Sequence, residues 1–259
     1  METVSFRALD APVKGYLQDD YDTLAAHKVR PALVICPGGA YRWRSPREKD
    51  PPAFEFLAMG YQVFILEYSC GELAGGLRPL RELGEAVRLL RERHREWHID
   101  PERIAVMGFS AGGHLAASLG AFWNDPSVAL PSGARPNALV LCYPVVSTKA
   151  FAHEESAEWV SGGDPALREK LHLWDRVTGD FPPTFLWHGG EDASVPPENS
   201  LLLAVELRRH KVPFEYHLFG GGAHGISICT QEVETPDEGC RAWVGLCKAW
   251  LNKRFQYTP

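Results

Sequence analysis

The chain has 259 residues, 45% hydrophobic and 23% charged, which is enough to bury the core of one soluble globular domain spanning 1–259. Its net charge of −6 argues against a nucleic-acid or anionic-membrane partner and fits a neutral or cationic small-molecule substrate. The apolar runs are only of strand length, and no basic segment with an apolar core opens the chain, so we expect a cytoplasmic protein without a membrane span. None of the six cysteines forms a C-x-x-C pair, which favours free thiols in a reducing compartment; the sequence leaves the oligomeric state open.

Apolar runs of strand length alternate with amphipathic segments from one end of the chain to the other. The strands are expected at 4–9, 32–36, 62–68, 104–107, 138–143, 183–188 and 214–219. The helices are expected within 47–59, at 80–97, directly after residue 110, at 197–211 and at 241–254. Residues 19–22 are polar and predict a turn. This alternation predicts the α/β class: a mostly parallel, doubly wound sheet with helices on both faces.

One segment interrupts the alternation. Residues 147–181 contain two tryptophans, a Gly-Gly pair and many charges, and they are long for a simple connection. The segment is either a small cap over the carboxyl edge of the sheet or an ordinary helical crossover with aromatic residues at the surface.

The strongest chemical signal is Gly108-Phe-Ser110-Ala-Gly112, which lies between an apolar run and the start of a helix. A strand, a sharp turn and a helix in this order would hold Ser110 at the tip of the turn, where its hydroxyl is presented for attack. Glycines two residues to either side suit a turn too tight for a Cβ atom.

Two further strands end in residues that complete this chemistry. Asp192 follows the strand at 183–188, and His224 follows the strand at 214–219 within a glycine-rich loop. A histidine can take the proton of a serine hydroxyl, and an aspartate can orient the imidazole and stabilise its charged form. Parallel strands bring their carboxyl ends to one edge, so we expect Ser110, His224 and Asp192 to form a catalytic triad. Glu191 stays open as an alternative acid because it is adjacent.

A tetrahedral oxyanion needs backbone N–H donors, and the segment Pro37-Gly38-Gly39-Ala40-Tyr41 after the first long strand can approach the site closely. We expect the amide of Ala111 to be one donor. The other is expected from Gly39 together with Gly38 or Ala40.

The motifs Cys36-Pro-Gly-Gly-Ala-Tyr41, Gly108-Phe-Ser-Ala-Gly-Gly-His114, Trp187-His-Gly-Gly-Glu-Asp-Ala-Ser-Val-Pro196 and Gly222-Ala-His-Gly225 together resemble the acetyl-xylan-esterase-like α/β hydrolases, close to the hormone-sensitive-lipase group. The resemblance runs from about residue 32 to the last helix. It implies the α/β-hydrolase fold and a serine carboxylesterase that removes short acyl groups, acetyl above all, from carbohydrates such as xylo-oligosaccharides. The chain departs from the family pattern at Ala40, which replaces a glycine, and lacks the leading histidine of the oxyanion segment.

Three residues after the oxyanion segment, Tyr41, Trp43 and Arg44, are expected either to line a sugar or acyl subsite or to be plain surface residues. His114 and His188 are expected to pack in the core. No His, Cys, Asp and Glu spacing indicates a metal, and the Gly75-Gly76 pair lacks the Lys-Ser/Thr of a phosphate loop, so no cofactor is predicted. Two alternatives stay open: a peptidase or lactone hydrolase on the same scaffold, and a non-catalytic ligand-binding protein.

Overall fold

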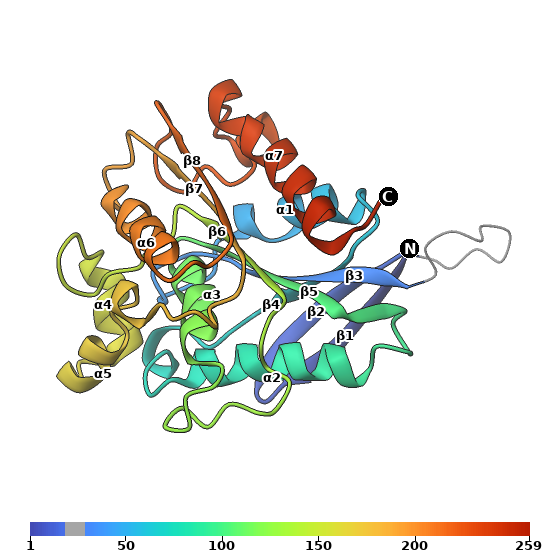
Figure 1. The fold of residues 1–259 in the computed structure, drawn as a ribbon, viewed down its shortest axis with the longest axis horizontal. Coiled ribbons are helices and arrows are strands. Elements are labelled where there is room, and N and C mark those ends of the chain that lie inside the picture. The colour runs from blue at the N-terminus through green and yellow to red at the C-terminus, as the bar shows by residue number, and fades with distance from the viewer. Residues whose placement is uncertain (19–28) are drawn as a thin grey trace, which may run out of the picture.

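A computed structural model describes residues 1–18 and 29–259 of the chain, and Figure 1 shows a central sheet between two layers of helices. The turn expected at 19–22 lies outside the described residues. The strands are β1 Glu2–Ala8, β2 Ala11–Leu17, β3 Arg30–Cys36, β4 Gln62–Leu66, β5 Ile99–Phe109, β6 Ala138–Cys142, β7 Thr184–Gly189 and β8 Phe214–Phe219. The α-helices are α1 Asp50–Leu57, α2 Arg78–Glu92, α3 Ala111–Phe122, α4 Glu154–Ser161, α5 Pro165–Lys170, α6 Glu198–Arg209 and α7 Glu238–Phe255. Short 3-10 helices occupy Pro46–Glu48, Gly71–Leu73, Trp174–Arg176 and Gln231–Val233.

The eight strands form one sheet in the order β1-β2-β4-β3-β5-β6-β7-β8. β3 to β8 are parallel to one another, whereas the hairpin of β1 and β2 joins β4 in antiparallel register. The α/β-hydrolase fold expected from the sequence is confirmed. The strand β2 was not predicted, because Pro12 and Gly15 interrupt its apolar pattern.

Two apolar cores cover the two faces of the sheet, and the strands contribute to them with the period of two that a pleated strand imposes. On β3, Ala32 and Val34 face one core, and Leu33 and Ile35 face the other. The first core packs against α2, α3 and α6, and the second packs against α1 and α7. Figure 1 shows α1 and α7 on one side of the sheet and α2 and α3 on the other. Burial on both faces explains the continuous apolar runs of β3, β4 and β6.

The segment 147–181 contains α4 and α5, which lie together to one side of α3 (Figure 1). Its backbone joins the rest of the molecule where the amide of Leu173 donates to the carbonyl of Val146. All six cysteines lie among the described residues and are free thiols. Within 1–18 and 29–259, no helix is long and apolar enough to cross a membrane.

Candidate active site

The nucleophile candidate stands where β5 turns into α3. Ser110 has φ 53° and ψ −118°, a conformation that side-chain-bearing residues rarely adopt, and α3 begins at the next residue. Its amide donates to the carbonyl of Cys142 at 3.0 Å, and its carbonyl accepts from the amide of His114 at 3.1 Å. These bonds to β6 and α3 fix the turn, so the Ser110 hydroxyl has a defined direction.

The two glycines around Ser110 are required by close packing. A Cβ atom built on Gly108 would lie 2.1 Å from the carbonyl oxygen of Gly112. A Cβ atom on Gly112 would lie 2.1 Å from the carbonyl oxygen of Cys36, at the end of β3. No real Cβ makes such contacts, so this turn fits against the neighbouring strand only with glycine at both positions.

The side chains of Ser110, His224 and Asp192 form one hydrogen-bonded chain. Ser110 Oγ lies 2.7 Å from His224 Nε2, and His224 Nδ1 lies 2.6 Å from Asp192 Oδ2. A carboxylate only accepts, so Nδ1 carries the imidazole proton and Nε2 is left to accept from the hydroxyl. The structure therefore brings together the three residues that the strand ends predicted, and the carboxylate bonded to His224 is that of Asp192, not of Glu191.

Asp192 is buried, and every oxygen of its carboxylate is bonded. Oδ1 accepts from the amides of Ser194 and Val195, at 3.0 Å and 2.9 Å. Oδ2 accepts from His224 and also from His188 Nε2 at 3.2 Å. Burial by itself would raise the pKa of Asp192, but the hydrogen bonds from the two histidines, the His224 charge and the Val195 amide outweigh it and lower the pKa. Asp192 is thus held ionised beside the imidazole.

The oxyanion loop, residues 37–41, runs past Ser110 in an unusual backbone conformation. Gly39 has φ 123°, Ala40 has φ 56° and Tyr41 has φ 62°. Within the described residues, the amides of Gly39, Ala40 and Ala111 have no protein acceptor. Unpaired amides beside a nucleophile are what a developing oxyanion requires. Glycine would adopt the left-handed φ of Ala40 without strain.

Gly38 does not belong to this set of donors. Its amide donates to Glu48 Oε2 at 2.7 Å, and both groups are buried. The expectation that Gly38 could supply an oxyanion donor is therefore wrong, because its N–H is already used.

The cavity next to Ser110 has a volume of about 230 Å³. Its lining includes Gly39 and Ala40 from the oxyanion loop together with Ser110 and His224. The other lining residues, mostly polar, are Trp43, Ser45, Arg47, Glu48, His153, Glu155, Ser194 and Gly225. Sequence reasoning singled out only Trp43 from this last group. The charged run at 47–50 and the histidine at 153 carry no motif, and only the folded chain brings them to the site.

Of the three residues expected at a subsite, only Trp43 lines this cavity. The ring of Tyr41 is 1% exposed, and its hydroxyl is bonded to His114 Nδ1 at 2.9 Å. Arg44 is paired with Glu67 at 2.6 Å and lines a neighbouring cavity instead. The subsite expectation is therefore wrong for Tyr41 and Arg44, because their own bonds turn them away from Ser110.

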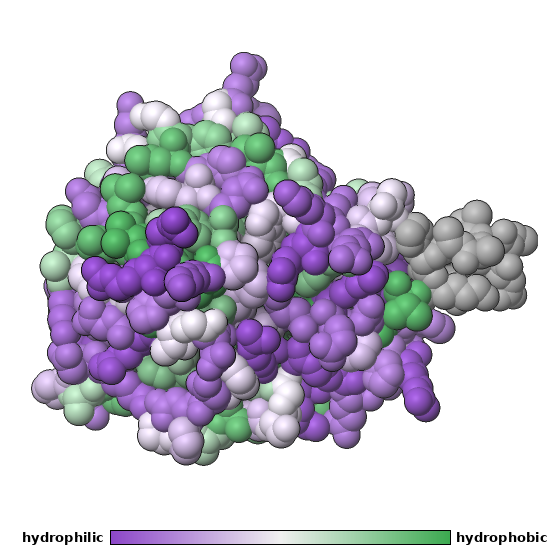
Figure 2. All heavy atoms as spheres, in the orientation of Figure 1, coloured by the Kyte–Doolittle hydropathy of each residue, from purple (hydrophilic) through white to green (hydrophobic). Residues whose placement is uncertain are grey.

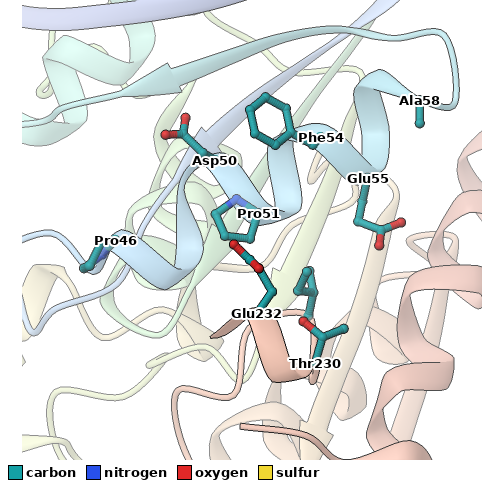
Figure 3. A pocket seen from close by; sticks show the side chains of 9 residues that line it. Pro46, Asp50, Pro51, Phe54, Glu55, Ala58, Thr230 and Glu232 are labelled. Atoms are coloured by element: carbon teal, nitrogen blue, oxygen red, sulfur yellow. The ribbon is translucent and has the colours of Figure 1, made fainter. Parts of the chain in front are cut away.

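A larger cavity of about 610 Å³ lies apart from this site, between α1 and residues 228–232 (Figure 3). Phe54 and Ile228 contribute apolar surface to it, and Asp50, Glu55 and Glu232 add carboxylates. Glu55 is paired with Arg241 and Lys248. Neither Ser110 nor His224 lines this cavity. Within 1–18 and 29–259, no cluster of His, Cys, Asp and Glu could hold a metal ion.

The eight-stranded sheet, the strained serine turn and the serine–histidine–aspartate chain define an α/β hydrolase. The chain belongs to the BD-FAE family, whose sequence profile matches residues 19–207.

Two curated relatives carry names connected with xylan. "Endo-1,4-beta-xylanase B" of Butyrivibrio fibrisolvens is 34% identical over 213 residues, which are 78% of this chain and 33% of that protein. "Acetylxylan esterase" of Xylanibacter ruminicola is 28% identical over 77% of this chain and 42% of that protein. The chain therefore spans less than half the length of these two relatives.

Solved structures match the fold over nearly the whole chain. The acetyl ester-xyloside bifunctional hydrolase of Caldicellulosiruptor lactoaceticus has a TM-score of 0.83 and 36% identity, covering 96% of this chain and 89% of its own. The carboxylesterase Cest-2923 of Lactobacillus plantarum has a TM-score of 0.87 and 25% identity, covering 100% of both chains.

Proposed function

We propose that the protein is a serine carboxylesterase that removes short acyl groups, acetyl above all, from hydroxyl groups of carbohydrates such as xylo-oligosaccharides. The observation that carries the proposal is the chain of bonds from Ser110 Oγ through His224 to the buried carboxylate of Asp192. The names of the relatives support the reaction class and point to acetylated xylan as the substrate.

In the acylation step, His224 Nε2 takes the proton of the Ser110 hydroxyl while Oγ attacks the ester carbonyl. The carbonyl oxygen becomes an oxyanion, which the amides of Gly39 or Ala40 and of Ala111 would stabilise. The imidazolium formed at His224 faces Asp192, whose low pKa keeps it negatively charged at every pH near neutrality. His224 then gives the proton to the leaving alcohol, and the acyl group remains on Ser110.

In the deacylation step, water takes the place of the alcohol. His224 removes a proton from the water, the hydroxide attacks the acyl carbonyl, and the same amides hold the second oxyanion. Return of the proton to Ser110 Oγ releases the carboxylic acid. These residues complete the cycle without a cofactor.

The size and lining of the cavity support a short acyl group and a polar alcohol. A volume of about 230 Å³ is below the ~300 to 1,000 Å³ usual for sites that enclose a drug-sized ligand. His153 Nδ1 accepts from the amide of Ser156, which leaves Nε2–H as its donor, and burial lowers the pKa of His153 so that it stays neutral. Together with Glu155 and Ser194, it offers hydrogen-bond partners suited to sugar hydroxyls.

We also propose that 147–181 is a cap within a single domain. His153 and Glu155 line the cavity, and the carbonyl of Leu171 accepts from His114 on α3, which supports this interpretation. The free thiols suit a reducing, cytoplasmic environment.

The first test compares turnover of p-nitrophenyl acetate by wild type and Ser110→Ala. Loss of the nucleophile is expected to lower kcat roughly a million-fold. The matched control is Ser118→Ala, a buried serine on the same helix that does not line the cavity, and its kcat should equal that of wild type.

The substrate class is tested separately. A series of acyl chains from acetate to octanoate should show the highest kcat/KM at acetate, and acetylated xylo-oligosaccharides should release acetate. Turnover of aminoacyl-arylamides or lactones in preference to acyl esters would instead favour the peptidase or lactonase. Failure of a fluorophosphonate probe to label Ser110 would favour a non-catalytic protein.

A further inference from the structure

Two carboxylates line the cavity without a bond to the serine–histidine–aspartate chain, Glu48 and Glu155, and only Glu48 is buried. Glu48 ends the 3-10 helix Pro46–Glu48, lines the cavity with Ser110, and is only 2% exposed. Its Oε2 accepts from the Gly38 amide at 2.7 Å, and its Oε1 accepts from the Tyr143 hydroxyl at 2.6 Å. Burial of a carboxylate is unfavourable unless both oxygens are bonded, so the bonds of Glu48 deserve a functional explanation.

The bond to Gly38 acts on the oxyanion loop. Gly38 directly precedes Gly39, whose amide is one of the unpaired donors beside Ser110. A Cβ atom built on Gly38 would lie 2.8 Å from Glu48 Oε2 and 2.9 Å from Ser110 Cβ. Glu48 Oε2 and Ser110 Cβ therefore both lie close to the Gly38 backbone, which leaves no room for a side chain at this position.

The bond to Tyr143 acts on the loop that carries His224. The Tyr143 oxygen accepts from the amide of Ser227 at 2.9 Å, three residues after His224. The Tyr143 ring also packs edge-on against the His224 imidazole, with ring centroids 5.1 Å apart. A second link runs from the Ser227 hydroxyl to the carbonyl of Arg47 at 2.6 Å. One buried side chain thus joins both loops that must meet at Ser110.

The donors define the protonation of Glu48. The Gly38 amide can only donate to Oε2, and the Tyr143 hydroxyl donates to Oε1 while its oxygen accepts from the Ser227 amide. Both oxygens of Glu48 therefore accept, as an ionised carboxylate does. Burial raises the pKa of Glu48 above its ordinary value, although the bonds from Tyr143 and Gly38 oppose that rise. A negative charge cannot itself stabilise an oxyanion, so contact with the reacting atoms is not its role.

We infer that Glu48 is a positioning residue, whose carboxylate fixes the oxyanion loop at Gly38 and the His224 loop through Tyr143. The inference rests on the proposed esterase function. By holding Gly38, Glu48 aligns the Gly39 amide with the oxyanion formed at Ser110.

The test is Glu48→Gln, which keeps the volume but replaces one accepting oxygen with an NH₂ group that cannot accept. With p-nitrophenyl acetate, kcat is expected to fall about tenfold to a hundredfold while KM changes less than about threefold, because oxyanion contacts form only in the transition state. Affinity for a methyl trifluoromethyl ketone, which forms a tetrahedral adduct with serine, should fall in parallel with kcat/KM. Tyr143→Phe leaves the Gly38 bond in place, so its loss of kcat should be smaller; it also serves if Glu48→Gln does not fold.

Glu82→Gln is the matched control. Glu82 is another buried carboxylate, and it accepts from the amide and the hydroxyl of Ser69, at 2.7 Å and 2.5 Å, without lining the cavity. The Glu82→Gln variant should have its Tm lowered as much as that of Glu48→Gln. Its kcat should stay within about twofold of wild type. Wild-type kcat and ketone affinity in Glu48→Gln, or equal losses in both variants, would overturn the inference. Failure of the esterase proposal can be told apart from failure of the Glu48 inference, because in the first case the wild type itself would turn over no ester.

Discussion

His114 shows how a buried ionisable residue can support the site without taking part in its chemistry. Its Nε2–H donates to the carbonyl of Leu171 at 2.9 Å, so Nδ1 accepts from the Tyr41 hydroxyl at 2.9 Å. Burial lowers the pKa of His114 to about 4, against a smaller rise from the Leu171 bond. The neutral ring therefore ties the oxyanion loop and residues 147–181 to α3.

This lowered pKa predicts a pH-dependent stability. Between about pH 6.5 and the folded pKa of about 4, the unfolded chain binds a proton at His114 that the folded chain does not. His114 therefore makes folding less favourable as the pH falls through this range, by up to about 3 kcal/mol. Urea unfolding of wild type and His114→Gln at pH 7, 5.5 and 4 should show the variant less stable at pH 7 and its disadvantage shrinking at pH 4. A difference independent of pH would contradict the assigned burial of a neutral ring.

For individual residues, the sequence predicts those that follow the ends of strands. It does not predict residues whose role depends on contacts made only in the folded chain. The placement of Ser110, Asp192 and His224 at one edge follows from parallel strands, because each residue lies in the loop or turn after the carboxyl end of one. Glu48 and Tyr143 are far apart in the chain and belong to no motif, so nothing in the sequence indicates their bond. The misplacement of Tyr41 has the same cause, since its partner is on α3.

Among the elements, the turn from β5 into α3 is the most constrained. Gly112→Ala would place a methyl group 2.1 Å from the Cys36 carbonyl oxygen, so β3 and α3 would have to separate. We expect a loss of more than about 2 kcal/mol in the free energy of unfolding, together with reduced kcat, because the Ser110 turn would shift.

The control for this change is Gly245→Ala. Gly245 lies on α7 and is exposed, and a Cβ atom added to it would meet no atom within 4 Å. Alanine favours helix over glycine, so this variant should gain about 0.5 to 1 kcal/mol with unchanged kcat. Urea unfolding of both variants gives the two free energies. Equal effects at the two glycines would refute the steric explanation.

The elements that sequence patterns predict best are those buried on both faces. Expected strands at 32–36 and 138–143 agree with β3 and β6 to within about two residues. The strand expected at 214–219 matches β8, although β8 lies at the edge of the sheet and is only partly buried. The helix expected at 80–97 ends earlier, at Glu92. Beyond it, the ring of His94 bonds to the carbonyl of Arg91 at 2.8 Å, and the backbone turns toward β5. A local bond of this kind competes with the helix and leaves no periodic signal.

In the whole molecule, the faces of the sheet and the carboxyl ends of its strands have different roles. The faces carry two apolar cores, and the carboxyl ends of the strands carry the reactive groups. On the face drawn in Figure 2, hydrophobic residues gather over the region of α6, whereas polar residues cover much of the rest. Leu201 and Val205 on α6 are 41% and 54% exposed, and neither lines the cavity at Ser110.

The positive φ of Ser110 sets a conflict between activity and stability. Glycine adopts this conformation without strain, whereas a residue with a side chain is strained by about 1 to 3 kcal/mol. The stability gained by a change to glycine is reduced because glycine has more conformational freedom in the unfolded chain. Ser110→Gly should therefore be inactive yet more stable by about 1 kcal/mol than Ser110→Ala, which keeps the strain. Thermal unfolding of the two variants side by side measures the difference. A glycine variant that melts below the alanine variant would show that the turn is relaxed.

If the nucleophile is strained in this way, natural selection for turnover must act continually to keep it. A gene copy released from that selection could drift to glycine at this codon and gain robustness as it loses its chemistry. Silent descendants of such a hydrolase would then be recognised by an intact scaffold, a retained histidine and aspartate, and a missing hydroxyl.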